Sequence, residues 1–558
     1  MTSRTVLHLV LAAALALAPA AASAATIVIQ NNDGAGEGFN DPTARAPVGG
    51  NPGVTLGQQR LNVFQRAADI WGGLLPSAVT IVVRAQFNPQ TCTATSAVLG
   101  SAGPVTAHRD FAGAEFPATW YHQALANRLA GVDLDPANPD INATFNLSLD
   151  AGCFTGGVWY YGFDGNEGND IELLPVVLHE IGHGLGFSTL TSGTTGAQNG
   201  GFPDVYSRFM LDNTTGLHWH QMSNAQRQAS AINTGNLVWD GPAVNAIAPS
   251  VLSKRARLTV STPALGDFAA GFASFGAALT QAGVTAQLIL GQDGTAPVND
   301  GCGPLVNVVT GRVVLLDRGV CAFTLKAQAA QNAGAVALII ANNVAGPPNE
   351  LGGSDPSITI PVISVSQATG TTLKTQLIGG PVTVNIGLHP TLLAGADAAG
   401  HVMLYAPNPL EGGSSLSHWD VSVTPNALME PFINDDLNDD VDLTIYHFVD
   451  IGWLDAVTAV SGPGSPARIQ LRAAAPNPFT TRTALRSDLE QAGMVELAVY
   501  DLRGSLVKRI HSGYRMPGSY TDTWDGTDSR GNRVASGVYL YRLKTPQGSA
   551  TKRAVLLP

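Results

Sequence analysis

Charged residues are scarce in this chain of 558 residues. Only 13% are Asp, Glu, Lys or Arg, against about 25% in a typical soluble protein. The 30 Lys and Arg are outnumbered by 42 Asp and Glu, which gives a formal net charge of -12 at pH 7. Because no basic stripe is available to neutralise phosphate groups, the composition argues against nucleic acid as a partner. The 62 Gly and 34 Pro predict a turn-rich, β-rich body.

Long hydrophobic runs are also missing beyond the N-terminus. No later stretch offers the roughly 20 uninterrupted apolar residues that a membrane-spanning helix needs. The N-terminus itself has Arg4, an apolar run over 6–22 and an Ala-Ser-Ala cleavage site at 22–24. This pattern is typical of a secretory signal peptide over residues 1–24. We therefore expect a secreted, extracellular protein with no transmembrane anchor after signal removal, either free or associated with the cell surface.

Cysteine is limited to four residues, Cys92, Cys153, Cys302 and Cys321. No Cys-x-x-Cys spacing occurs, so a cysteine zinc site is not expected. An even number of cysteines in an exported chain favours two disulfides over free thiols. Three pairings are open at this level.

The most informative stretch that is present reads HEIGH and spans residues 179–183. On a helix, His179 and His183 project from one face, and Glu180 sits beside them with its carboxylate free to reach a metal-bound water. Catalytic zinc sites use neutral imidazole ligands and leave one position open for water. The motif therefore predicts a catalytic Zn²⁺ site that still needs a third protein ligand.

The sequence around this motif predicts a buried helix. Its flanks are apolar, and unpaired histidines and a glutamate would be costly there without a partner such as a metal. Gly182, Gly184 and Gly186 weaken the helix, each by roughly 1 kcal/mol relative to alanine, so we expect tertiary packing and close backbone approach to support it. The alternative is an ordinary surface helix that carries the motif by chance.

The chain is too long for one hydrophobic core, and about 150 residues per domain suggests three or four units. A strand over 25–30, a helix over 61–75 and a strand over 79–87 precede the motif and indicate an α+β domain. Residues 255–390 show a different pattern of predicted elements, with a helix over 323–333 and strands over 312–316, 335–341 and 358–365. They predict a separate β-rich domain inserted into the first.

A Pro- and Gly-rich linker over 461–470 precedes the last unit, residues 471–558. Gly-rich turns separate alternating segments there, which predicts a small antiparallel β-sandwich. The strands are expected over 482–489, 494–500, 506–510, 520–524, 538–543 and 551–557.

The insertion resembles a protease-associated (PA) domain. The resemblance rests on GRVVLLDRGVCAF at 311–323 and IIANN at 339–343. In that family the domain is a non-catalytic lid or substrate-binding module. If the insertion is one folding unit, we favour the pairing of Cys302 with Cys321 and of Cys92 with Cys153. Each disulfide then lies within a single folding unit.

The last unit resembles bacterial FlgD-like immunoglobulin domains and the related C-terminal sorting domains of type IX secretion. The matching residues are PNPF at 476–479, VYDLRG at 499–504, WDGTD at 524–528 and GVYLYRL at 537–543. The resemblance implies contact with export machinery or with the cell surface.

The third metal ligand is not at the simplest position. Metzincin peptidases place a glycine three residues after the second histidine and a third histidine three residues later, but here Gly186 is followed by Thr189. His218 and His220 form one rival pair, since on a strand they would share a face, although no methionine turn follows them. The downstream candidates are His218, His220, His389, His401, His418 and His447.

Three downstream blocks, together with residues 179–187, resemble leishmanolysin-type metallopeptidases. They are SHWD at 417–420, NALMEP at 426–431 and LTIYHFVDIGW at 443–453. In that family a large insertion separates the helix from the third histidine, a methionine turn follows, and a final helix ends near Asp-Ile-Gly-Trp. The resemblance implies that His418 is the third ligand and that Met429 lies beneath the metal.

The expected architecture is α+β. A metzincin-like zinc peptidase domain, formed by residues 25–250 and 391–460, is interrupted by the PA domain and followed by the antiparallel sandwich. The resemblance implies a secreted zinc endopeptidase that hydrolyses protein or peptide substrates with Glu180 as general base. The alternatives are an inactive or weakly active cell-surface binding protein on a peptidase fold, and a zinc amidase for non-peptide substrates.

Two acidic stretches are candidate binding sites for a second cation. Residues 164–170 contain two aspartates and a glutamate, and a second cluster follows the methionine turn. A solvated loop and a Ca²⁺ site are both compatible with them, although neither has EF-hand spacing. The second cluster comprises Asp435, Asp436, Asp439, Asp440 and Asp442.

Overall fold

The computed structural model describes most of the chain in nine ranges. The described residues are 24–433, 437, 441–454, 470–489, 493–501, 506–515, 518–528, 532–545 and 548–557. The predicted signal peptide up to residue 23, the linker over 461–469, and Asp435, Asp436, Asp439 and Asp440 lie outside them. Within the described ranges, no helix combines the length and the apolar content needed to cross a bilayer.

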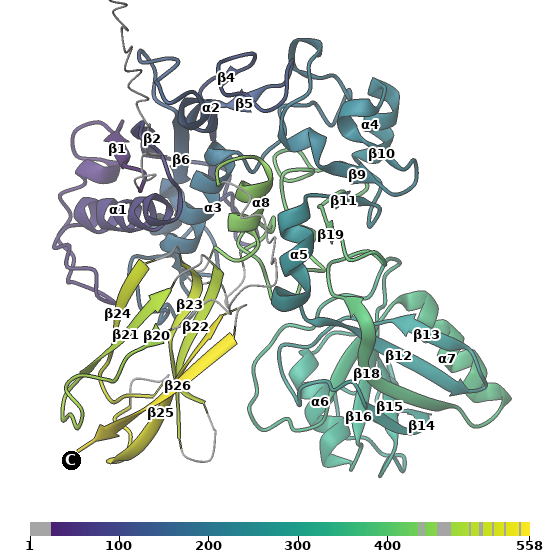
Figure 1. Cartoon of the computed structure of the whole chain (residues 1–558). Helices are drawn as coiled ribbons and strands as arrows, with labels where there is room; N and C mark the ends of the chain where they lie inside the picture. The colour runs from purple at the N-terminus through teal and green to yellow at the C-terminus, as the bar shows by residue number, and fades with distance from the viewer. Residues whose placement is uncertain are drawn as a thin grey trace, which may run out of the picture.

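The first part of the chain builds a four-stranded sheet covered by two helices (Figure 1). The first three strands are parallel, and the last one pairs antiparallel at the edge. In spatial order the strands are β1 (Ile27–Asn31), β2 (Ile81–Asn88), β6 (Ile141–Asn146) and β3 (Gly100–Pro104).

Helix α1 (Leu56–Leu74) packs on this sheet through a fully buried stripe that includes Val63, Phe64, Ala67 and Trp71. The helix begins five residues before the predicted start at 61, because the Thr55 side chain accepts a hydrogen bond from the Gln58 amide and caps it. The predicted strand over 79–87 corresponds to β2.

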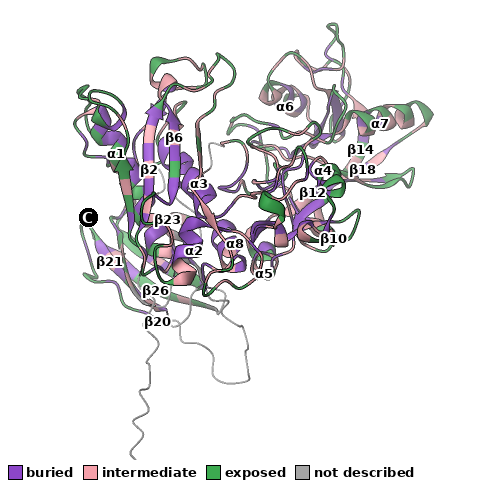
Figure 2. Ribbon diagram, turned by 90° about the horizontal axis from the view of Figure 1, so that it is seen from above, coloured by how far each residue is buried: buried purple, intermediate pink, exposed green. Residues whose placement is uncertain are grey.

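Helix α3 (Leu173–Leu185) carries the HEIGH motif and lies in the centre of the molecule (Figures 1 and 2). Every residue of α3 except His179 is buried. Gly184 allows close contact with β6, because a Cβ there would lie 2.4 Å from Cγ2 of Ile141. Gly186 ends the helix with a φ of 131°, in the region that favours glycine. The glycines therefore serve the close approach expected from the sequence.

Short elements connect β3 to α3 and α3 to the insertion. Before α3 these are β4 (Ala107–His108), β5 (Tyr121–His122), α2 (Gln123–Ala130), β7 (Trp159–Tyr160) and β8 (Ile171–Glu172). After α3 they are β9 (Met210–Asp212), β10 (Leu217–His218), α4 (Asn224–Ser230), β11 (Leu237–Trp239) and α5 (Pro242–Val251).

The chain on both sides of the insertion forms one unit. Strand β19 (Val402–Met403) follows the insertion yet pairs with β11, which precedes it. Helix α8 (Thr444–Asp450) packs on α5, and both Asp450 carboxylate oxygens accept hydrogen bonds from the first turn of α5. One hydrophobic core contains residues from both sides, including Trp71, Met429 and Trp453.

The insertion is a seven-stranded mixed sheet with two helices and cores of its own. It extends slightly beyond the predicted 255–390, because its first strand begins at Lys254 and its last ends at Leu393. The predicted strand over 358–365 is shorter, since pairing with β16 begins only after Pro361, at Val362. In spatial order the strands are β13 (Gly266–Ala269), β12 (Lys254–Thr262), β18 (Thr383–Leu393), β14 (Val284–Leu290), β15 (Val313–Asp317), β16 (Ala337–Ala341) and β17 (Val362–Val365). The helices are α6 (Phe323–Asn332) and α7 (Gln367–Gly379).

The C-terminal unit consists of two antiparallel sheets that enclose a core around Trp524. The predicted strand over 506–510 continues to Arg515, since its pairing with β22 runs that far. One sheet has the order β20 (Gln470–Leu471), β21 (Thr483–Leu489) and β24 (Gly518–Trp524). The other has the order β23 (Leu506–Arg515), β22 (Gly493–Tyr500), β25 (Gly537–Thr545) and β26 (Gly548–Leu556).

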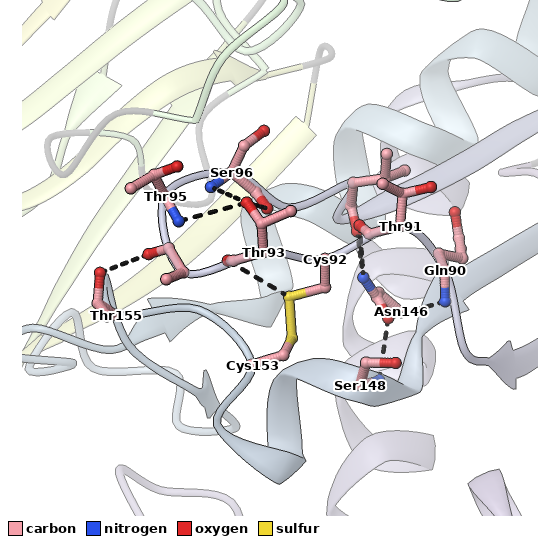
Figure 3. Close-up of a disulfide and its surroundings, with 12 residues drawn as sticks. Gln90, Thr91, Cys92, Thr93, Thr95, Ser96, Asn146, Ser148, Cys153 and Thr155 are labelled. Atoms are coloured by element: carbon pink, nitrogen blue, oxygen red, sulfur yellow. Dashed lines mark hydrogen bonds between the residues drawn. A yellow bond between two sulfur atoms is a disulfide. The ribbon is translucent and has the colours of Figure 1, made fainter.

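Two disulfides are present, Cys92–Cys153 and Cys302–Cys321. This is the pairing favoured from the domain organisation. Each bridge joins residues of one folding unit, the first in the part of the chain before α3 (Figure 3) and the second inside the insertion.

Candidate metal centre

Three histidines that are far apart in the sequence converge on one point. His179 and His183 come from successive turns of α3, and His418 comes from the loop after β19. The Nε2 atoms are 3.0 Å apart for His179 and His183, 3.1 Å for His179 and His418, and 3.2 Å for His183 and His418. Among the described residues, they form the one group of three or more His, Cys, Asp or Glu with metal-ligand spacing.

The tautomers of these histidines leave three lone pairs facing one another. The Nδ1 atoms donate to backbone carbonyls, from His179 to Leu428 at 2.7 Å, from His183 to Phe187 at 2.8 Å, and from His418 to Ser414 at 2.6 Å. Each proton is therefore on Nδ1, and the Nε2 atoms have none to share. Three converging lone pairs repel unless a cation lies between them.

The spacing also fits the size of zinc. Zinc–nitrogen bonds of about 2.0–2.1 Å in a tetrahedron put the ligand nitrogens about 3.3 Å apart, close to the separations found here. Burial lowers the pKa of His179 to about 4 and that of His183 to about 3, and it holds the pKa of His418 well below the usual value. The three rings are therefore neutral at pH 7, as metal ligands must be.

Glu180 lies beside this cluster and against the edge strand β3. Burial raises the pKa of its carboxyl to about 8, and a backbone hydrogen bond at Ala102 partly offsets this effect. A Cβ on Gly100 would lie 3.1 Å from Cγ of Glu180. The absence of a side chain at Gly100 thus leaves room for the glutamate between the helix and the strand.

Met429 lies under α3. A Cβ on Gly182 would be 3.0 Å from the Met429 sulfur, so the glycine lets the thioether approach the helix backbone. The Met429 carbonyl accepts the amide of Trp419, and the preceding carbonyl of Leu428 is the partner of His179. The turn that contains Met429 therefore supports two of the histidines through its backbone.

The other candidate residues lie elsewhere. The Thr189 hydroxyl donates to Asp204 at 2.9 Å and not toward the cluster. The rival pair His218 and His220 do not share the face of a strand, because β10 ends at His218 and His220 belongs to a short 3-10 helix. His218 contacts Asp240 at 2.9 Å, which also pairs with His401.

Two further candidates have structural roles. His389 Nδ1 accepts a hydrogen bond from the Leu392 amide within strand β18 of the insertion. His447 is completely buried among aromatic rings, with Trp239 and Phe187 at 4.3 and 4.4 Å between ring centroids. Neither residue belongs to the histidine cluster.

Calcium receives no support from the described residues. Their carboxylates form no group with metal-ligand spacing. Asp442 accepts hydrogen bonds from the backbone amides of Leu428 and Thr444, so it stabilises the turn that contains Met429. The other four aspartates of that cluster lie outside the described part of the chain.

Sequence reasoning missed three features that position the site. Strand β3 reads Gly-Ser-Ala-Gly-Pro and contains no β-branched or aromatic residue that would signal a strand. His122 is fully buried with Nε2 2.8 Å from the Ser188 hydroxyl. The Trp453 indole donates to the Leu185 carbonyl at 2.7 Å and ties the last block of the domain to α3. Of these three features, only Trp453 had a signal in the sequence, because it belongs to a block that resembles leishmanolysin-type peptidases.

Comparison with known families identifies two parts of the chain. Residues 284–373 match the PA domain, and residues 475–549 match the FlgD Ig-like domain. The chain therefore contains a PA domain within its insertion and an Ig-like domain at its C-terminal end. Both predictions are confirmed.

The curated relatives are peptidases and other proteins that share a short region. The probable lipoprotein aminopeptidase LpqL of Mycobacterium tuberculosis is 42% identical over 112 residues, 19% of this chain and 21% of that protein. Leucine aminopeptidase 2 of Arthroderma otae is 35% identical over 108 residues, 19% of this chain and 20% of that protein. The chain thus spans about a fifth of the length of these relatives. Such a stretch is too short to include both His183 and His418, which are 235 positions apart.

Solved structures also match parts of the chain. A zinc aminopeptidase from Bacillus subtilis is 24% identical and covers 26% of this chain and 36% of its own, with a TM-score of 0.20. FlgD from P. aeruginosa is 27% identical and covers 17% of this chain and 75% of its own, with a TM-score of 0.13. The leishmanolysin-type resemblance of the metal-centre residues stays a prediction.

Proposed function

We propose that this protein is an exported zinc-dependent endopeptidase of the leishmanolysin-like, metzincin type. The observation that carries the proposal is the convergence of His179, His183 and His418 with their Nε2 lone pairs facing one another. Glu180 lies beside them on the same helix. This donor set suits zinc, and it leaves the fourth tetrahedral position to water or substrate.

A zinc ion held by these histidines would supply Lewis acidity and a water of lowered pKa. The protein's own contribution begins with the three backbone carbonyls that orient the imidazoles through Nδ1. Glu180 is the general base in this proposal. The pKa of its carboxyl, which burial raises, would be lowered by a zinc ion bound beside it, so that the carboxylate can take the proton of the attacking water and return it to the leaving amine.

The neighbouring strand β3 suits a peptide as substrate. It is the last strand of its sheet and pairs with β6 on one side. Its other edge can add an extended peptide through main-chain hydrogen bonds. Because Gly100 and Ala102 of β3 contact Glu180, a peptide on this edge would pass beside the general base.

A second candidate activity is that of an aminopeptidase, which the names of the relatives favour. An aminopeptidase needs a free substrate N-terminus, whereas an endopeptidase cleaves a chain with both ends blocked. An N-acetylated, C-amidated reporter peptide therefore separates the two activities. Cleavage of this peptide supports the endopeptidase, and cleavage of the unblocked form alone supports the aminopeptidase.

The full test combines digestion of casein and of the blocked peptide with metal analysis. We expect one zinc per chain, cleavage that a chelator abolishes and that added zinc restores, and loss of cleavage by orders of magnitude in Glu180→Gln with zinc retained. Zinc without cleavage of any protein or peptide would support the inactive binding protein. Turnover of small amides alone would support the amidase.

The two accessory domains have separate roles in this proposal. The PA domain influences access to the centre and contributes to substrate binding. The Ig-like domain serves export or attachment to the cell surface. Removal of residues 475–558 tests the second role, because we expect the shortened protein to keep its peptidase activity and to change its location.

A further inference from the structure

A cavity of about 330 Å³ lies at the N-terminal end of α3, the helix that carries His179 and His183. Pro175 lines it and is one helical turn before His179, on the same face of the helix. Since α3 rises 1.5 Å per residue, Pro175 and His179 are separated by roughly 6 Å along the helix axis. Ile433, four residues after Met429, also lines the cavity. The cavity is therefore within reach of a side chain next to the bond being cleaved.

The lining of this cavity is acidic. Glu167, Asp170 and Glu172 contribute carboxylates, and neither lysine nor arginine is among the lining residues. The Oε2 atom of Glu167 is buried and accepts no hydrogen bond. Glu172 and Glu167 also contribute to a raised pKa of the neighbouring Tyr160, after burial and Asp164. Negative charge therefore dominates around the cavity.

The walls of the cavity are held rigidly. Thr155 lines it and donates through both its amide and its hydroxyl to the carbonyl of Ala94. The Cys92–Cys153 disulfide anchors the same segment two residues earlier (Figure 3). Asp170, another lining residue, accepts the Val158 amide at 3.1 Å. A preformed cavity of this kind selects a side chain by shape and charge.

We propose that this cavity binds a lysine or arginine side chain of the substrate and directs cleavage to bonds next to basic residues. The proposal rests on the proposed peptidase function and names its substrate class. Apolar Pro175, Ile171 and Ile433 pack along the aliphatic stem, and the carboxylates face the cationic head. The lining carboxylates form no group of three with metal-ligand spacing, which favours an extended side chain over a single ion.

The test uses three blocked reporter peptides that differ only next to the scissile bond, where they carry Arg, Leu or Glu. The zinc-loaded full-length enzyme is expected to cleave the Arg peptide with a kcat/KM at least about tenfold higher than that of the Leu peptide, and the Glu peptide slowest. The Arg preference is expected to fall as salt is added, because it is electrostatic.

Glu167→Gln tests the assignment to the cavity. Its ratio of kcat/KM for the Arg peptide over the Leu peptide is expected to drop about tenfold. Asp69→Asn, which removes an exposed carboxylate from α1, is the matched control and should keep the ratio of the unchanged enzyme. If Glu167→Gln does not fold, Asp170→Asn serves the same test, since an amide oxygen can still accept the Val158 amide.

The outcomes separate the two proposals. Equal cleavage of the three peptides, or an unchanged ratio in Glu167→Gln, overturns the basic-residue specificity and leaves the peptidase intact. No cleavage of any peptide by the zinc-loaded enzyme overturns both. Loss of the Arg preference in the presence of millimolar Ca²⁺, with Ca²⁺ bound to the unchanged enzyme but not to Glu167→Gln, would identify the cavity as a calcium site and also overturn the proposal.

Discussion

Gly184 and Ile141 meet so closely that no side chain fits between them. A Cβ on Gly184 would lie 2.4, 2.7 and 2.8 Å from three side-chain carbons of Ile141. This contact holds α3 close to β6 and sets the distance between the metal-binding helix and the sheet. The position of the two helical histidines therefore depends on a glycine that neither binds the metal nor transfers a proton.

Gly184→Ala should destabilise the protein, because α3 or β6 must shift to admit the methyl group. We expect the free energy of unfolding to fall by about 2 kcal/mol and zinc affinity to fall with it. Gly73→Ala is the matched control. It is an exposed position of α1 with no atom within 4 Å of the added Cβ, so it should gain about 0.5–1 kcal/mol.

Urea denaturation of both variants measures this difference. Equal stability of Gly184→Ala and the unchanged protein would show that Ile141 can move aside, contrary to our expectation.

His418→Ala should abolish tight zinc binding. We expect a loss of affinity beyond the roughly 10- to 100-fold that removal of a ligand's hydrogen-bond partner costs, since one of three protein donors is lost. His218→Ala and His389→Ala should retain zinc, because both side chains lie outside the cluster. Competitive titration with a chromophoric chelator measures the affinity. Unchanged zinc binding in His418→Ala would require a different third ligand.

Buried histidines should make the domain sensitive to acid. Burial lowers the pKa of His122 to about 4 and that of His447 well below the usual value, and both nitrogens of His447 have no hydrogen-bond partner. Since the unfolded chain binds protons near pH 6.5 and the folded state does not, stability is lost as the pH falls from about 6.5 toward 4. His122 alone accounts for about 3 kcal/mol over this range.

His447→Phe removes one of these groups while it keeps a ring among the surrounding aromatic side chains. We expect this variant to lose less stability between pH 7 and 5 than the unchanged protein, whereas His389→Phe in strand β18 of the insertion should not differ. The comparison is made by urea denaturation of the zinc-free proteins, so that metal release does not contribute. An identical pH dependence of His447→Phe and the unchanged protein would contradict the assignment.

The Cys92–Cys153 disulfide should stabilise the peptidase domain and the wall of the acidic cavity. The bridge closes a loop with a sequence separation of 61, for which chain entropy gives about 4 kcal/mol. We expect the Cys92→Ser, Cys153→Ser double variant to unfold at lower urea and to lose selectivity between the Arg and Leu peptides. The Cys302→Ser, Cys321→Ser pair in the insertion should leave that selectivity unchanged.

Local patterns predicted much of the fold, and the misses have physical reasons. Helix α1 and strand β2 follow from apolar periodicity, but the first turn of α1 depends on the Thr55 cap and carries little periodic signal. The short strand β3 has no β-forming residue and exists because β6 supplies its hydrogen bonds. Its position beside Glu180 could not be read from the chain.

The sequence by itself determined that His179 and His183 share a helix face with Glu180 beside them, because covalent spacing and the 3.6-residue helical period decide that relationship. Its resemblances also indicated the PA and Ig-like domains, which the family comparisons confirm. The spacing of the residues left several distant histidines open and a resemblance implied His418, but only the tertiary structure brings one of them to the pair. His418 reaches His179 across 239 positions because β19 pairs with β11 and closes the chain around the insertion. Such a contact depends on the packing of both halves into one core, and no local pattern encodes it.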